Sequence, residues 1–513
     1  MLLIEVVETS ATVAATRSRK EKVAALAGCL RRAEPDEIET VTSYLGGALR
    51  QRRTGVGWRG AGASIDAAGT PTLTVTEVHE AFDLLAALSG AGSQGARSAA
   101  LGDLLGRATE AEQTWLRGAL TGAVRQGALE ALVQEAVAAA AEVPLPAVRR
   151  AAMLAGCTVP IAAAAFSGGE PVLAAVGLEV GRPVLPMLAS SAPDLTTAMA
   201  KVGGGLVAVD AKLDGIRIQV HRVGDEVRIA TRSLDDITDR LPEVVAIARA
   251  LPADRFVLDG EALALADDGR PRPFQETASR TAQESGVVIT PYFFDLLHLD
   301  GLDLLDSPGS ERLARLTALV PEAHVVPRLV TDDLATAEDF ARHVLSDGHE
   351  GVVVKNLDAP YDAGRRGSTW VKVKPVHTLD LVVLAVEWGS GRRQGWLSNI
   401  HLGARDPDTG GFVMLGKTFK GMTDAMLAWQ TERFTELATS PADQSSYVVH
   451  VAPVQVVEIA FDGVQRSSRY PGGVALRFAR VLRYRDDKTA EQADTIETVR
   501  AYLVARHSPQ SMW

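Results

Sequence analysis

The sequence predicts three domains in a row: all-α, then α+β, then all-β. Up to about residue 180, apolar residues recur mostly at helical spacing. Between about 204 and 375, short alternating runs mix with helical segments, and past His377 an alternation with a period of two prevails. A chain of 513 residues is long enough for each domain to bury a core of its own.

The first domain carries a specific helix signal. Thr109 followed by Glu112 is a capping-box pattern, and it opens an alanine-rich stretch, 109–143, that predicts helix. Around 167–195 the composition changes to Gly, Pro and Ser, which predicts the boundary with the second domain.

The second domain is predicted to alternate strands with helices. Two segments have helical spacing, 241–251 and 310–319. Short β-branched or alternating runs predict strands at 206–213, 216–221, 226–231, 256–265, 290–295 and 351–355.

Residues 207–221, VAVDAKLDGIRIQVH, hold three charged side chains inside a strand pattern. Because strand side chains alternate between faces, Asp210, Lys212 and Asp214 share one face. Two interpretations fit. The segment is a half-solvated hairpin with Asp214-Gly215 at its turn, or it is the wall of a pocket in which Lys212 does chemistry.

The third domain is predicted from several short strand-like runs over roughly 100 residues, separated by glycine turns. Such a pattern is typical of a small β-barrel or β-sandwich. We find no internal repeat in the chain.

Composition narrows the class of protein. Hydrophobic residues make up 46% and charged residues 23% of the chain, as in ordinary globular proteins. No apolar run reaches the roughly 18 residues of a membrane span, and the opening MLLIEVVETS carries acids where a signal peptide needs bases. Two cysteines, Cys29 and Cys157, cannot supply a four-cysteine zinc site. We therefore expect a cytoplasmic protein that binds no membrane.

The net charge of −11 argues weakly against a nucleic-acid partner, which usually meets a basic surface. The basic residues are clustered, however, above all in 466–488, which holds seven of them and two acids. Local basic patches are compatible with an anionic partner despite the negative net charge.

Carboxylates and lysines on strand-like runs suggest a site for phosphate and metal. Glu261 lies in FVLDGEALAL, where it shares a face with Asp259, and Glu350 opens EGVVVKN. Lys372 and Lys374 share a face in WVKVKP. Carboxylate oxygens suit Mg²⁺ and cations suit phosphates, although each run alone is better explained as structure than as function.

Taken in order, these runs resemble the motif set of the covalent nucleotidyltransferases, and the ATP-dependent DNA ligases most closely. PVLPMLA at 183–189 is similar to that family's entry into its catalytic domain, and the resemblance covers nearly the whole chain, most loosely in 1–100. The motifs are KLDGIR (212–217), TRS (231–233), LDGEAL (258–263), YFFDLLHLDG (292–301), EGVVVKN (350–356), WVKVKP (370–375) and RFARVLRYRDDK (477–488).

The resemblance implies a fold for each domain. Residues 1–185 would be an all-α DNA-binding domain, and 186–376 an α+β nucleotidyltransferase domain of the ATP-grasp-like adenylation type. Residues 377–513 would be an all-β OB-fold domain that swings over the pocket in the first step and away again to admit DNA.

The resemblance also implies residue roles around a lysine nucleophile. Lys212 would take AMP as a phosphoramidate, Asp210 would help to read the adenine, and Phe294 would stack on it. Asp210 departs from the glutamate that many relatives carry, and Ala479 stands where proline is common. Contact with the nucleotide's sugar and phosphate would fall to Arg217 and Arg232, and contact with the ribose and the metal to Glu261 and Glu350. The α-phosphate would be held by Arg366, Lys372 and Lys374. The pyrophosphate would be oriented by Arg477, Arg480, Arg483 and Lys488.

The implied activity is ATP-dependent sealing of nicks in duplex DNA, with Mg²⁺ or Mn²⁺ as the metal and a monomer as the working form. A sliding clamp is a partner that the sequence does not identify. RNA ligases and mRNA-capping guanylyltransferases are alternatives within the superfamily, but they are not expected to carry nearly 200 helical residues ahead of the lysine. An NAD⁺-dependent ligase is disfavoured by the two cysteines, and a non-catalytic DNA-binding scaffold by the intact set of lysines and glutamates.

Overall fold

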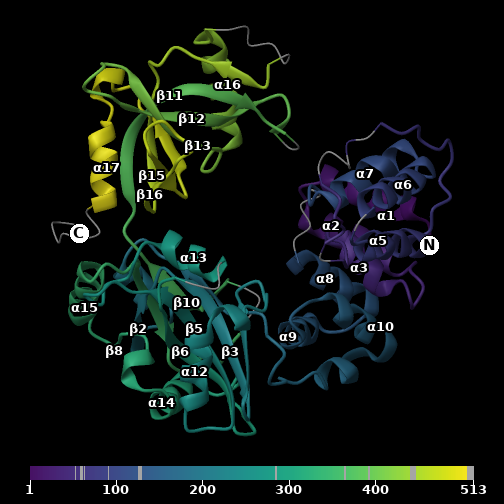
Figure 1. The fold of residues 1–513 in the computed structure, drawn as a ribbon, viewed down its shortest axis with the longest axis horizontal. Coiled ribbons are helices and arrows are strands. Elements are labelled where there is room, and N and C mark those ends of the chain that lie inside the picture. Colours follow the sequence, from purple (N-terminus) through teal and green to yellow (C-terminus); the bar gives the residue numbers. More distant parts are fainter. Residues whose placement is uncertain are drawn as a thin grey trace.

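Three lobes make up the fold in this computed structural model (Figure 1). The structure describes residues 1–504 except 52, 58–61, 63, 91, 125–129, 283–285, 363–365, 391–392 and 440–445, and it describes no side chain for 281, 282, 366 and 504.

The first lobe is helical, as predicted. Its core is one cluster of buried Leu, Val and Ala side chains with Tyr44, Phe82 and Trp115 among them. The helices are α1 (Leu3–Ala15), α2 (Arg19–Leu30), α3 (Ile38–Leu45), α5 (Val75–Ala87), α6 (Ser93–Gly106), α7 (Glu110–Leu120), α8 (Glu130–Ala141), α9 (Leu145–Ala155) and α10 (Val159–Ala174).

Two details of this lobe differ from expectation. The Thr109 capping box is present, but the stretch it opens is two helices rather than one, because α7 ends at Leu120 and Gly122 then takes a positive φ of 65°. The boundary also begins later than 167, because α10 runs on to Ala174. Gly169 adopts a non-helical kink inside it, which lets Pro171 start a new turn.

The second lobe contains two five-stranded sheets, ordered β1-β10-β9-β2-β8 and β4-β3-β5-β6-β7. All six predicted strands and both predicted helices are present. The strands are β1 (Leu188–Ser191), β2 (Val207–Lys212), β3 (Ile216–Val223), β4 (Glu226–Thr231), β5 (Arg255–Ala264), β6 (Ile289–Leu299), β7 (Leu302–Asp303), β8 (Arg328–Thr331), β9 (Gly351–Asn356) and β10 (Arg366–Val373). The helices are α11 (Leu195–Lys201), η1 (Thr238–Arg240), α12 (Pro242–Ala250), α13 (Phe274–Ala282), α14 (Gly309–Leu319), η2 (Glu322–His324) and α15 (Leu334–Ser346).

The alternation of side chains predicted for 207–213 is confirmed, and it determines on which side of β2 the charged side chains lie. Val207, Val209 and Ala211 are buried in one cluster with side chains of α11 and α15. Asp210 and Lys212 therefore project to the other side of β2, where a cavity lies.

The third lobe is rich in strands but not purely β. Its main sheet runs β13-β12-β11-β15-β18, with β14 paired to β11, and β16 pairs with β17. The all-β expectation missed two helices whose apolar residues, Leu427 and Phe434 in one and Ile496 and Val499 in the other, complete the core of the sheet. The elements are β11 (His377–Trp388), β12 (Leu397–Arg405), β13 (Phe412–Thr418), α16 (Asp424–Glu436), β14 (Val448–His450), β15 (Val456–Phe461), β16 (Gly463–Arg466), β17 (Val474–Arg477), β18 (Arg480–Tyr484), η4 (Ala490–Gln492) and α17 (Ile496–Val504).

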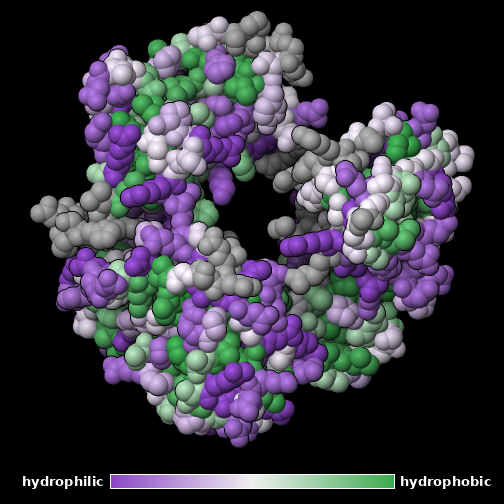
Figure 2. Space-filling view, in the orientation of Figure 1, coloured by the Kyte–Doolittle hydropathy of each residue, from purple (hydrophilic) through white to green (hydrophobic). Residues whose placement is uncertain are grey.

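The three lobes surround an opening that Figure 2 shows through the middle of the molecule, with hydrophilic residues along much of its edge. The helical lobe and the strand-rich lobe approach each other at Arg17 and Asp424, whose charged atoms are 3.2 Å apart. Among the helices that the structure describes, none is both long and apolar enough to span a membrane.

Candidate active site

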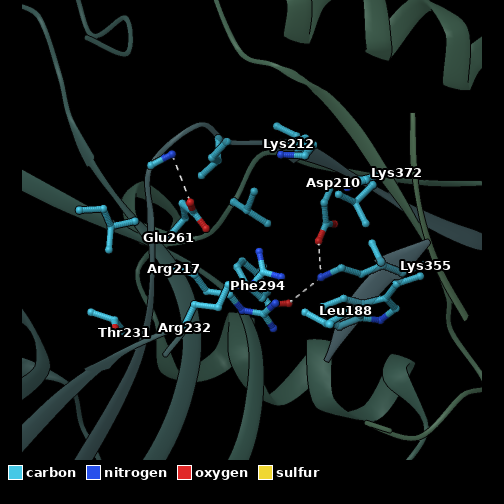
Figure 3. A pocket seen from close by; sticks show the side chains of 18 of the residues that line it. Leu188, Asp210, Lys212, Arg217, Thr231, Arg232, Glu261, Phe294, Lys355 and Lys372 are labelled. Atoms are coloured by element: carbon cyan, nitrogen blue, oxygen red, sulfur yellow. Dashed lines mark hydrogen bonds and ion pairs between the residues drawn. The ribbon is translucent and has the colours of Figure 1, made fainter. Parts of the chain in front are cut away.

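A cavity of about 450 Å³ lies where the two sheets of the second lobe meet (Figure 3). One sheet contributes side chains from β1, β2, β9 and β10, and the other contributes side chains from β3, β4, β5 and β6. The cavity therefore collects residues that are up to 184 positions apart in the sequence, from Leu188 to Lys372.

Lys212 ends β2 at the edge of this cavity and is paired with a carboxylate. The register of β2 and β9 sets Lys212 opposite Gly351, so Glu350 lies directly beside it. Lys212 Nζ donates to Glu350 Oε2, and Lys374 Nζ donates to Oε1 at 2.9 Å. Burial alone would raise the pKa of Glu350, but the charges of Lys212 and Lys374 outweigh it and hold this pKa below its usual range.

Glu261 is the second carboxylate of the cavity, and its pKa moves the other way. Its Oε1 accepts the backbone N–H of Gly215 at 3.1 Å. A Cβ at position 215 would lie 2.3 Å from the carbonyl oxygen of Ala262, so this approach of the β2–β3 connection to β5 requires glycine. Burial raises the pKa of Glu261 to about 7, although Lys212 and Arg217 partly oppose the shift.

Arg217 is held in place by a buried frame. Its Nε and Nη2 bind the two oxygens of Asp259 at 3.0 and 2.7 Å, and its Nη1 donates to the carbonyl oxygen of Met187 at 2.6 Å. The Tyr361 hydroxyl donates to Asp259 Oδ2 at 2.7 Å and accepts the N–H of Met187 at 3.0 Å. The Arg217 guanidinium carbon lies 5.4 Å from the centroid of the Phe294 ring.

The far end of the cavity is aromatic, with a buried ion pair. Asp210 is paired with Arg328, Nη2 to Oδ2 at 2.8 Å, and with Lys355 at 2.7 Å. Burial alone would raise the pKa of Asp210, but these two cations outweigh it and lower the pKa. The Lys355 ammonium also lies 4.6 Å from the ring centroid of Phe294 and 4.1 Å from that of Trp370, within cation–π range.

The strand-rich lobe contributes charged side chains at the mouth of the cavity. Arg477 binds Asp214 through two bonds of 2.6 and 3.1 Å, and its guanidinium lies 5.2 Å from the ring centroid of Phe274. Asp462 accepts from Lys374. The predicted hairpin is wrong, because β2 and β3 belong to different sheets and do not pair. Asp214-Gly215 instead connects the two sheets, and Asp214 makes an inter-lobe contact that the alternation pattern could not reveal.

The residues named from the motif set lie at different distances from the cavity. Lys212, Asp210, Arg217, Arg232, Glu261, Phe294 and Lys372 line the cavity, and Glu350, Lys374 and Arg477 are bonded to residues at its edge. Arg480 lies one step further out, 3.6 Å from Asp462. Arg483 and Lys488 do not reach the cavity but pair with Glu458 and Asp380 of their own lobe, and the side chain of Arg366 lies outside the described residues.

Several residues of the site carried no usable sequence signal. Tyr361 lies in a loop between strands, and Arg328 opens a short strand that was not predicted. Lys355 in EGVVVKN and Trp370 in WVKVKP both line the cavity, but the motif set implies no role for either. A lysine that directly follows an apolar, β-branched run is the one sequence signal that could have identified Lys355, because lysines are rarely buried without a partner.

Comparisons with known proteins agree with this arrangement. Three family models match the chain: "DNA ligase N terminus" over 61–138, "ATP dependent DNA ligase domain" over 186–374, and "ATP dependent DNA ligase C terminal region" over 393–488.

Relatives match over almost the full length. A "Probable DNA ligase" of Nocardioides sp. strain JS614 is 72% identical over 508 residues, 98% of this chain and 99% of that protein. One of Kineococcus radiotolerans is 65% identical over 504 residues, with the same shares. A solved structure called Pmar-Lig_PreS3 shares the fold with a TM-score of 0.62 at 18% identity, covering 94% of this chain and 99% of that one.

A helical lobe, a nucleotidyltransferase middle domain around Lys212 and a strand-rich C-terminal domain define a multi-domain ligase. The chain belongs to the family of ATP-dependent DNA ligases, enzymes that form phosphodiester bonds.

Proposed function

We propose that this ligase seals nicks in duplex DNA through a lysyl-AMP intermediate on Lys212. The observation that carries the proposal is the position of Lys212 Nζ, at the edge of a cavity that also presents two carboxylates, two further lysines and aromatic rings. That set suits a nucleotide with a nucleophile beside its phosphates.

The reaction has three displacements at phosphorus. In the first, Lys212 Nζ gives up a proton and forms an N–P bond to the α-phosphate of ATP, and the bond to pyrophosphate breaks. In the second, an oxygen of the 5′-phosphate at the nick attacks that phosphorus, and the N–P bond breaks. In the third, the 3′-hydroxyl attacks the DNA phosphate, the two strands are joined and AMP leaves.

The cavity suggests where the nucleotide lies. The base would sit on Phe294 at the Asp210 end, and the ribose and phosphates would extend past Arg217, Arg232 and Glu261 towards Lys212. Lys372, Lys374 and Arg366 would hold the α-phosphate. Glu350 Oε2 accepts from the Lys212 ammonium, so it orients the nucleophile before the proton leaves.

Glu261 and Glu350 are the residues that would hold Mg²⁺ or Mn²⁺. Carboxylate oxygens are the ligands that such hard cations prefer, and the raised pKa of Glu261 indicates a buried carboxylate that a nearby cation would stabilise in its charged form. Among the described residues no cluster of three acidic, His or Cys side chains occurs, so substrate oxygens and water would complete the coordination. When bound, the metal would neutralise charge on the phosphates.

The strand-rich lobe supports the proposed OB-fold and its part in the first step. Five strands in the order β13-β12-β11-β15-β18, with a helix between the third and the fourth of them along the chain, suit a small barrel of this kind. Arg477 would face the pyrophosphate, with Arg480 behind it. We propose the same role for Arg483 and Lys488 only in another position of the lobe, since both are paired elsewhere here.

The domain limits stay as predicted: 1–185, 186–376 and 377–513. The separate cores of the helical lobe and the strand-rich lobe support them. Duplex DNA is the proposed partner and a monomer the proposed form, since one chain already surrounds an opening. A cytoplasmic location remains a prediction.

One gel tests the proposal. The protein is incubated with α-labelled ATP, GTP or NAD⁺ and Mg²⁺, then denatured. We expect label from ATP alone, its loss in Lys212→Ala, and its retention in Lys201→Ala, a lysine outside the cavity. Nicked duplex DNA should then discharge the label and be sealed. Absence of label from every nucleotide would contradict the proposal, label from GTP alone would favour the capping alternative, and sealing of RNA only would favour an RNA ligase.

A further inference from the structure

A buried tyrosine hydroxyl connects three parts of the nucleotide cavity. Tyr361 is 1% exposed, and its oxygen uses its full hydrogen-bonding capacity. It donates to Asp259 Oδ2, accepts the N–H of Met187, and lies 3.4 Å from Arg217 Nη2 as a second acceptor contact.

The frame determines how Arg217 meets the cavity. A guanidinium has five N–H groups, and four of those of Arg217 are directed at Asp259, Tyr361 and Met187. Within the part of the chain that the structure describes, only one N–H, on Nη1, is left for a ligand. Without the Tyr361 hydroxyl, Asp259 would lose a donor and the loop at Met187 an anchor, so the guanidinium could rotate.

Asp259 needs this support because it is fully buried. Its carboxylate is 0% exposed and has Arg217 as its ion-pair partner. A buried carboxylate with fewer donors is costly, and the ring of Tyr361 that carries this donor is itself packed edge-on against Trp370, with centroids 5.9 Å apart.

We propose that Tyr361 is a positioning residue for nucleotide binding: its hydroxyl orients Arg217, through Asp259 and Met187, towards the bound ATP. The proposal rests on the proposed function in one respect, namely that this cavity is the ATP site.

The test is the affinity for α,β-methylene-ATP, an analogue that cannot release pyrophosphate, measured by calorimetry on the full-length protein after any bound AMP has been discharged with pyrophosphate. Tyr361→Phe keeps the ring and removes only the hydroxyl. We expect affinity to fall about tenfold, the loss typical of one hydrogen bond to a charged network. Tyr484→Phe is the matched control: it removes a buried hydroxyl bonded to Gln430 at 2.7 Å in the strand-rich lobe, and should leave affinity unchanged.

A second comparison separates positioning from general loosening of the fold. In an Arg217→Ala background, Tyr361→Phe should cost no further affinity, since the hydroxyl acts through the arginine. An equal tenfold loss in that background, or no loss in the parent protein, would overturn the proposal. If Tyr361→Phe does not fold, Asp259→Asn takes its place with the same two expectations.

The readout distinguishes this inference from the proposed function. Binding of the analogue does not depend on a covalent step, so Tyr361 can be judged even in a protein that takes no label on Lys212. Conversely, the parent protein could take label on Lys212 while the parent and Tyr361→Phe bind the analogue with equal affinity. That result would uphold the proposed function and overturn the role of Tyr361.

Discussion

Glu261 and Glu350 are the same kind of residue in the same site, yet their pKa values move in opposite directions. Glu350 lies between two lysines, which outweigh its burial and lower its pKa. Burial raises the pKa of Glu261 to about 7, because the charges of Lys212 and Arg217 and the N–H of Gly215 oppose it only in part. The difference comes from which strand neighbours reach each carboxylate, not from residue type.

These opposite shifts predict opposite effects of pH on stability. With a folded pKa of about 7 and an ordinary value near 4.5, Glu261 holds its proton more tightly when folded. Its contribution to the free energy of unfolding therefore falls as pH rises from about 4.5 to about 7. Glu261→Gln in metal-free protein should raise the melting temperature relative to the parent at pH 8 and change it little at pH 4.5.

Glu350→Gln is the paired variant of opposite sign. Because its folded pKa is lowered, the carboxylate stabilises the fold above its ordinary pKa, and this is lost on acidification. The variant should melt below the parent at pH 8 and approach it in acid. Equal changes for both variants at both pH values would show that the two carboxylates do not differ in this way. Thermal melts by circular dichroism decide it.

At the scale of elements, helix α9 of the first lobe packs against residues that form the wall of the cavity. Met153 and Leu154 are buried in one cluster with Tyr361 and Trp370, and the carbonyl oxygen of Met153 accepts the N–H of Leu185 at 2.9 Å. The segment after Leu185 carries Met187, which is bonded to Arg217. The helical lobe is thereby packed against the wall of the cavity, in addition to the DNA-binding role proposed for it.

Truncation of a side chain in this contact should lower the affinity for ATP. Leu154→Ala removes a fully buried side chain, which typically costs 2–5 kcal/mol of stability. We expect it also to weaken binding of α,β-methylene-ATP several-fold, because the wall at Trp370 loses its support. Leu26→Ala, equally buried in the core of the helical lobe, should cost similar stability and leave the affinity unchanged. A Leu154→Ala protein with normal affinity would contradict the idea.

At the scale of the whole molecule, two ion pairs and a hydrogen bond hold the strand-rich lobe over the cavity. Arg477 binds Asp214, Lys374 binds Asp462, and Gln275 donates to the carbonyl oxygen of Arg466 at 3.1 Å. Polar contacts of this kind can be exchanged for others, as the proposed movement of the lobe away from the cavity to admit DNA requires.

Removal of the Arg477 contact should therefore slow the transfer of AMP to Lys212 more than the final sealing of the nick. Arg477→Ala is expected to slow transfer of AMP to Lys212 at least tenfold. Sealing of a nick whose 5′-phosphate already carries AMP should change only a few-fold, since that step follows the opening of the lobe. Arg433→Ala, which removes an exposed arginine paired with Glu436 of the same helix at 3.5 Å, is the control and should change neither rate. Equal slowing of both steps by Arg477→Ala would argue against a role confined to the first step.

Much of the fold could be predicted because it depends on local pattern. The period of two in 207–213 places Lys212 opposite the packed face of β2, and the capping box at Thr109 begins a helix where expected. The missed helices α16 and α17 and the late end of α10 have a common cause. Their apolar spacing is short or interrupted by glycine, and only packing against a sheet or a neighbouring helix stabilises them.

The sequence by itself determined the order of the three lobes, the strand that carries Lys212 and the motif residues that resemble those of the ligase family. Only the tertiary structure decided which of those residues meet. It brought Glu350, 138 positions away, to Lys212, set Tyr361 between Asp259 and Met187, and placed Arg477 on Asp214 while Arg483 and Lys488 paired elsewhere. The physical reason is that local pattern specifies which face a side chain takes, whereas its partner depends on strand register and lobe packing across long sequence distances.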